Sequence, residues 1–118
     1  MRIMLLLVFI AHATSTATTT KYTLHANANS FTGYGGIDID TDNAPVRMTV
    51  AQCQHRCTDD PACDCVTYAP NGFNSAWGRC WKRKQCESSK FKRGEGIFDV
   101  YMKSPVSQKI LLTYTLAN

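Results

Sequence analysis

The stretch T-V-A-Q-C-Q-H-R-C-T-D-D-P-A-C-D-C-V-T-Y, which runs from Thr49 to Tyr68, decides the fold, because it holds four of the six cysteines. Thr49 and Gln52 fit the capping-box pattern, in which a threonine oxygen accepts a backbone N–H and a glutamine side chain reaches back to the cap. The pattern predicts a helix over residues 50–58.

One face of this helix should carry two cysteines. Cys53 and Cys57 lie one helical turn apart, so their side chains point the same way. Asp59-Asp60-Pro61 should end the helix, because proline has no N–H and disfavours a helical residue before it. Cys65-Val66-Thr67-Tyr68 is rich in strand formers. The stretch therefore predicts a helix, a tight turn and a strand, with the cysteines on the strand side.

The first residues have the pattern of a secretory signal peptide. Met1-Arg2 supplies a positive charge, a short apolar run follows, and small residues suitable for cleavage come next. We expect residues 1–17 to be a signal peptide that is cleaved after Ala13 or Ala17. The apolar run is too short for a membrane-spanning helix. The alternative is a buried N-terminal strand or helix.

The cysteine count favours a disulfide framework. Six cysteines in a short secreted chain are typical of stapled domains, and they allow fifteen pairings, between which spacing alone does not choose. A zinc site at Cys53, Cys57, Cys63 and Cys65, with His55 nearby, is the alternative. Because secretion places the chain in an oxidising compartment, we expect no metal.

The rest of the chain divides around this framework. We expect a flexible start at residues 18–21, one domain over 22–103 and a C-terminal tail over 104–118, with one further strand near 110–114. The other strands are expected near 22–26, 36–40, 77–81 and 97–102, and residues 87–96 are expected to form an exposed loop.

An acidic segment, Asp38-Ile39-Asp40-Thr41-Asp42-Asn43, is similar to the start of a calcium-binding loop. The EF-hand pattern needs glycine at its sixth place and glutamate at its twelfth, where this chain has Asn43 and Thr49. A solvated acidic loop is therefore the expectation, and an irregular calcium site is the alternative.

The cysteine pattern resembles the PAN/Apple domain family. The resemblance rests on the C-x3-C helix of Cys53 and Cys57, the Asp60-Pro61-Ala62-Cys63 turn and the Cys80-Trp81-Lys82 strand. It implies an α+β fold: a small disulfide-rich domain in which a twisted antiparallel sheet of about five strands cradles one helix.

The resemblance also implies the disulfide pairs Cys53–Cys80 and Cys57–Cys63, which leaves Cys65 and Cys86 to each other. Apple domains have a further bridge that joins the two ends of the domain. No cysteine lies before Cys53 or after Cys86 in this chain, so this bridge is absent.

Binding is the function that the sequence favours. No catalytic set is found around His25, His55 or the carboxylates, no phosphate-binding loop occurs, and we expect neither enzymatic activity nor a cofactor. Members of the family generally bind proteins or carbohydrates. The resemblance therefore implies a secreted, extracellular recognition or adhesion module, and the alternative is a small basic effector such as a toxin, antimicrobial or inhibitor.

A basic cluster and several aromatic residues could bind the ligand. The chain carries a net charge of +4, and seven bases lie between positions 79 and 93. They could attract a glycan, including a sulfated or sialylated one, or an acidic extracellular protein. Nucleic acid and a membrane span are not expected, and the oligomeric state is not predicted. The candidate ligand-binding residues are Tyr68, Phe73, Trp77, Arg79, Lys82, Arg83, Lys84, Lys90, Lys92 and Arg93.

Overall fold

The structure, a computed structural model, describes residues 8–12, 17–108 and 113–117, and describes side chains for residues 19–104. The chain divides into a unit from Thr20 to Ser104 and a second unit made of its two ends. In the second unit, strand β1 (Val8–His12) pairs antiparallel with strand β10 (Thr113–Ala117). The predicted cleavage site after Ala13 and most of the predicted strand at 110–114 lie outside the described residues.

Helix α1 (Val50–Thr58) of the larger unit forms where the capping box predicts it. The side-chain oxygen of Thr49 accepts the N–H of Gln52 at 3.1 Å, and the side-chain oxygen of Gln52 accepts the N–H of Thr49 at 3.0 Å. A cap of this kind stabilises a helix by about 1 kcal/mol. The helix buries Cys53 and Cys57. Among the described residues, no helix has the length and apolar character needed to cross a membrane.

The main sheet of the described residues has six strands in the order β2–β9–β6–β7–β5–β4, rather than about five. The strands are β2 (Ala17–His25), β4 (Phe31–Thr32), β5 (Gly35–Asp38), β6 (Cys65–Pro70), β7 (Gly78–Lys84) and β9 (Asp99–Gln108). The central pairs are antiparallel, whereas the short β4 and β5 run parallel. Residues 18–21, expected as a flexible start, lie in β2. The α+β class is confirmed.

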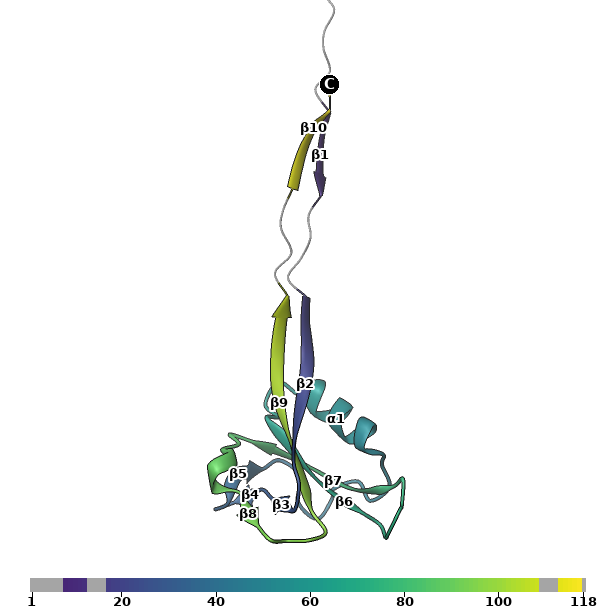
Figure 1. Ribbon diagram of the computed structural model, residues 1–118, viewed down its shortest axis with the longest axis vertical. Coiled ribbons are helices and arrows are strands. Elements are labelled where there is room, and N and C mark those ends of the chain that lie inside the picture. Colours follow the sequence, from purple (N-terminus) through teal and green to yellow (C-terminus); the bar gives the residue numbers. More distant parts are fainter. Residues whose placement is uncertain (1–7, 13–16, 109–112, 118) are drawn as a thin grey trace, which may run out of the picture. The chain divides into compact units, whose positions relative to one another are not determined.

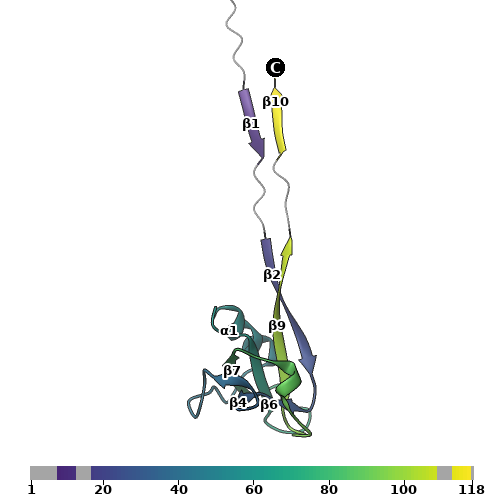
Figure 2. The same cartoon turned by 90° about the vertical axis from the view of Figure 1, so that its left-hand side faces the viewer.

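Two buried clusters cover the two faces of the sheet. Successive residues of a strand point to opposite faces, so Val66 faces α1 and Cys65 faces away from it. The cluster on the helix side contains Cys53, Cys57, Cys63, Val66, Tyr68 and Cys80. The cluster on the other side contains Ala28, Cys65, Phe91 and Val100. Figure 1 and Figure 2 show α1 lying over one face of the sheet.

Loops and very short strands close the second face. Strand β3 (Ala28–Asn29) pairs with β8 (Lys92–Arg93), and a short 3₁₀ helix, η1 (Ser88–Lys90), precedes β8. The expectation that residues 87–96 form a wholly exposed loop is wrong at Phe91, which is only 5% exposed. Its ring fills the space that the sheet leaves open on this side, so the segment is part of the core.

Candidate functional site

The six cysteines form the scaffold of the domain. Cys53 is joined to Cys80, Cys57 to Cys63 and Cys65 to Cys86, with Cα–Cα distances of 5.6, 5.1 and 6.1 Å. These are the pairs that the family resemblance implies. Because every sulfur is bonded to another, no thiolate is left for the zinc site considered above. Within the described residues, no group of three or more His, Cys, Asp or Glu side chains could hold a metal ion.

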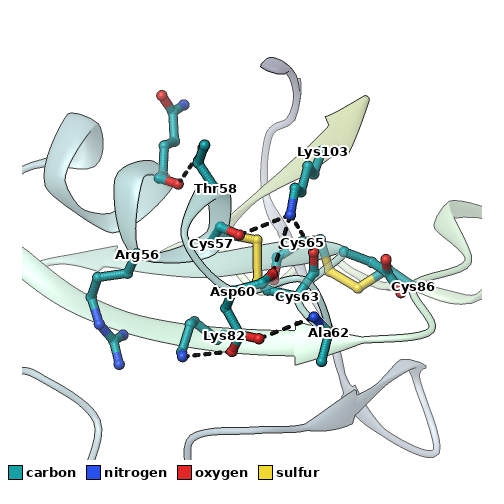
Figure 3. The surroundings of a disulfide bond; sticks show 12 residues. Arg56, Cys57, Thr58, Asp60, Ala62, Cys63, Cys65, Lys82, Cys86 and Lys103 are labelled. Carbon is teal, nitrogen blue, oxygen red and sulfur yellow. Dashed lines mark hydrogen bonds and ion pairs between the residues drawn. A yellow bond between two sulfur atoms is a disulfide. The ribbon is translucent and has the colours of Figure 1, made fainter. Parts of the chain in front are cut away.

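A lysine closes the end of the helix beside the Cys57–Cys63 disulfide. The ammonium group of Lys103, on β9, donates to the carbonyl oxygens of Cys57, Cys63 and Asp60 at 2.9, 3.1 and 3.2 Å (Figure 3). The last carbonyls of a helix have no partner within the helix. The carbonyls of Cys57 and Asp60 also accept the backbone N–H groups of Asp60 and Cys63. Lys103 therefore adds a second donor to these two carbonyls and the donor for Cys63, and its charge suits this negative end of the helix.

The acidic segment is solvated at Thr41, Asp42 and Asn43, as expected, but not at Asp40, which is only 7% exposed. Its two carboxylate oxygens accept from the guanidinium of Arg56 at 2.8 and 3.2 Å, and one of them also accepts the N–H of Lys82 at 2.9 Å. Burial favours a higher pKa for Asp40, but the hydrogen bonds and charges of Arg56 and Lys82 outweigh it and hold this pKa below its ordinary value. Asp40 therefore serves the core.

Two of the predicted ligand residues are buried, so the expectation that they line an exposed site is wrong. Tyr68 is 3% exposed, and its hydroxyl donates to the carbonyl of Met48 at 2.9 Å. Arg83 is 6% exposed, donates to the carbonyls of Ser30 and Asp40, and pairs with Asp38 at 3.1 Å. Burial lowers the pKa of Arg83, while both aspartates oppose this shift.

The seven predicted bases do not form one patch. The alternation of β7 sends Lys82 to the helix side, where it pairs with Asp60 at 2.8 Å, and Arg83 to the other side. The hydrogen bond from Lys82 holds the pKa of Asp60 below its ordinary value. Four of the bases make ion pairs, namely Lys82–Asp60, Arg83–Asp38, Lys90–Glu87 and Lys92–Glu95. Arg93 donates to the carbonyl of Ser88, and Lys84 is exposed.

A hollow of about 340 Å³ lies between the β6–β7 loop and the loop before β9. It is lined by Asn27, Pro70, Gly72, Phe73, Gly96, Ile97 and Asp99. Phe73 is 98% exposed and Ile97 is 67% exposed, so the apolar part of the lining is open to water. Asn27 and Asp99 supply polar groups, and one oxygen of Asp99 accepts the N–H of Asn27 at 3.0 Å. We call this feature the loop-end hollow.

The two tryptophans of this region both lie under arginines. The guanidinium of Arg47 lies 5.1 Å from the ring centre of Trp77, and that of Arg79 lies 5.0 Å from the ring centre of Trp81. Trp81 also contacts Arg83, at 5.9 Å, and is half-buried. Trp77 is 40% exposed.

Sequence reasoning named Phe73, Trp77 and Arg79 as candidates but did not name four other residues of this region. Arg47 and Asn27 are distant in sequence, and only the folded backbone brings them to the loop. Ile97 and Asp99 were treated as members of a strand. The one available signal was Ile97 itself, an apolar residue at the edge of the predicted strand and directly after Gly96.

Comparison with known proteins identifies the class of this domain. The model of the PAN domain family matches residues 27–112. The chain therefore belongs to the PAN domain family, whose members are non-catalytic modules that bind protein or carbohydrate in extracellular proteins. Neither the search of curated proteins nor that of solved structures found a match.

Proposed function

We propose that the protein is a secreted recognition module that binds carbohydrate or protein outside the cell, with its contact surface at the loop-end hollow. The observation that carries this proposal is the almost complete exposure of Phe73 beside a hollow that also contains polar groups. Removing an aromatic side chain of this size from water contributes roughly 1.5–3 kcal/mol. A ligand that covers Phe73 gains this free energy, and the folded domain alone does not.

Carbohydrate fits the hollow better than a flat protein surface. Sugar rings have one apolar face, which packs on an aromatic ring, and hydroxyl groups, which bind carboxylates and amides. Phe73 offers the ring, while Asp99 and Asn27 offer polar atoms a short way from it. The hollow therefore combines an aromatic platform with a few polar groups, as small-ligand sites do.

Secretion is supported by two independent features. Residues 1–17 have the composition of a signal peptide. All three disulfides need an oxidising compartment to form and persist. Expression in a secreting host followed by mass spectrometry of the released protein tests this part. We expect a new N-terminus after position 13 or 17 and no free thiol.

A glycan array with the soluble, oxidised protein tests the binding proposal. The matched variants are Phe73→Ala and, as a control, Leu24→Ala, which removes another exposed apolar side chain from strand β2. Phe73→Ala should weaken binding to the best glycan about tenfold or more, as loss of a central contact does, and Leu24→Ala should not. Equal binding by both variants and the parent would place the contact surface elsewhere, and no glycan binding at all would leave only protein ligands.

A further inference from the structure

Arg47 and Arg79 form a pair of positive charges with no negative partner. Met48 and Gly78 form an antiparallel bridge, with reciprocal backbone hydrogen bonds of 2.9 and 2.7 Å. Arg47 directly precedes Met48 and Arg79 directly follows Gly78, so the two arginines occupy facing backbone positions beside this bridge. Their guanidinium groups lie over different indole rings, Trp77 for Arg47 and Trp81 for Arg79. Within the described residues, neither guanidinium makes an ion pair with an acid.

Most buried or half-buried basic side chains of the domain have an acid or carbonyl partner, and Arg79 does not. Five basic side chains in the described part of the chain are buried or half-buried: Arg56, Arg79, Lys82, Arg83 and Lys103. Arg56 pairs with Asp40, and Lys82 pairs with Asp60. Arg83 pairs with Asp38 and donates to two carbonyl oxygens. Lys103 donates to three carbonyl oxygens. Arg79 is the exception among them, and its Nε is buried with no hydrogen-bond partner. A buried donor without a partner costs free energy.

The tryptophans hold both guanidinium groups in place. Each arginine lies about 5 Å from the centre of an indole ring. A cation over a ring face is attracted by the ring, and this attraction restricts the otherwise flexible arginine side chain. The N–H donors of a guanidinium lie in its plane, so contact with a ring leaves them free to bind an anion. The rings therefore orient both arginines, and the Nη donors of both make no hydrogen bond within the described residues.

We propose that Arg47 and Arg79 bind sulfate groups of a sulfated glycan, with Trp77 and Trp81 as the supports that orient them. Arginine binds planar or tetrahedral oxyanions through two parallel hydrogen bonds, and these are stronger than bonds between neutral groups. The choice of a glycan as the carrier of the sulfate rests on the proposed function, whereas the anion site itself rests on the arginine pair.

Calorimetric titration of the full chain with a heparin-derived hexasaccharide, and with the same hexasaccharide after desulfation, tests the proposal. The variants are Arg47→Gln, Arg79→Gln and the exposed control Lys21→Gln, which also removes one positive charge. Each arginine variant should weaken binding of the sulfated sugar about tenfold, the size expected for one charge-assisted pair. Lys21→Gln should change it less than about twofold, since exposed charges are screened by salt.

The outcomes separate this inference from the proposed function. Arg47 is exposed, so its variant should fold normally even if Arg79→Gln does not, and the disulfide map of each variant checks this. If Lys21→Gln weakens binding of the sulfated sugar as much as the arginine variants do, the effect is one of overall charge, and the proposed site is wrong. Equal binding of sulfated and desulfated sugar, or binding of an acidic peptide only, would overturn it too. In both cases, binding that still depends on Phe73 would leave the proposed function standing.

Discussion

Replacing Lys103 with methionine should destabilise the domain strongly, although the side chains have similar lengths. The change removes three hydrogen bonds that the ammonium group donates to the carbonyls of Cys57, Cys63 and Asp60. It leaves the disulfide and the apolar part of the side chain in place. The carbonyls of Cys57 and Asp60 keep the backbone N–H groups of Asp60 and Cys63, at 3.2 and 3.0 Å. The carbonyl of Cys63 then depends on whatever water reaches this half-buried position.

The size of the effect follows from the number and kind of these bonds. A hydrogen bond to a charged group contributes about 1.5–3 kcal/mol, and a buried acceptor left without a partner costs about 1–3 kcal/mol. The three bonds share one ammonium group, which water solvates in the unfolded chain, so their energies do not add. We expect a loss of about 2–4 kcal/mol in the free energy of unfolding, a large part of the total for a domain of this size.

Urea denaturation of the oxidised protein, followed by tryptophan fluorescence, measures this loss. The control is Lys21→Met, at an exposed position on β2, which should change the free energy of unfolding by less than about 0.5 kcal/mol. Both variants need intact disulfides, because loss of a bridge would itself cost about 2–4 kcal/mol. If Lys103→Met lies within 0.5 kcal/mol of the control, backbone donors and water satisfy the three carbonyls without Lys103, and the role assigned to Lys103 is wrong.

Two further variants test the core. Asp40→Asn should reduce the acid sensitivity of folding: the pKa of Asp40 is held below 3.8, so its contribution is present above that pH and is lost as the pH falls through the folded-state pKa. Acid titrations should show that Asp40→Asn loses less stability below about pH 4 than the parent protein does. The exposed control Asp42→Asn should behave like the parent. Identical curves for both variants would contradict the charge network around Asp40. Gly78→Ala should destabilise the domain by about 1–3 kcal/mol, because the new Cβ would lie 2.6 Å from the ring of Tyr68, whereas Gly72→Ala meets no atom within 4 Å and should change little. Thermal unfolding measures both glycine variants, and equal midpoints would show that the sheet adapts at this point.

Local patterns accounted for much of the fold. The helix over residues 50–58 could be predicted because its cap is contained in the four residues 49–52. Its end is marked by residues 59–61, which directly follow the helix. The central strands could be predicted from their apolar and β-branched residues. Strand β4 could not, because it has two residues and pairs only with the short β5. Such pairings depend on the folded backbone and leave no periodic signal in the sequence.

The predicted site was less accurate because charge in a sequence does not reveal its partners. Arg83 and Asp40 are separated by 43 positions, yet the guanidinium of Arg83 donates to the carbonyl of Asp40. Lys82 and Asp60 are separated by 22. Lys82 and Arg83 of the basic second half therefore pair with Asp60 and Asp38 of the acidic first half. Lys90 and Lys92 pair with nearby glutamates, so four of the seven bases of the predicted binding surface make ion pairs.

This pairing gives the unpaired arginines their significance. In a domain where most cations were solvated, two more without partners would carry no information. Here the folded structure satisfies the half-buried cations one by one, through carboxylates or helix-end carbonyls, and leaves Arg79 next to Arg47 with only ring faces for support. An arrangement that costs the free domain stability is expected where a ligand regains it. Since Trp77 lies in the same segment as Phe73, the anion site and the loop-end hollow belong to the same end of the sheet, and one glycan with both a sulfate and an uncharged ring would satisfy both.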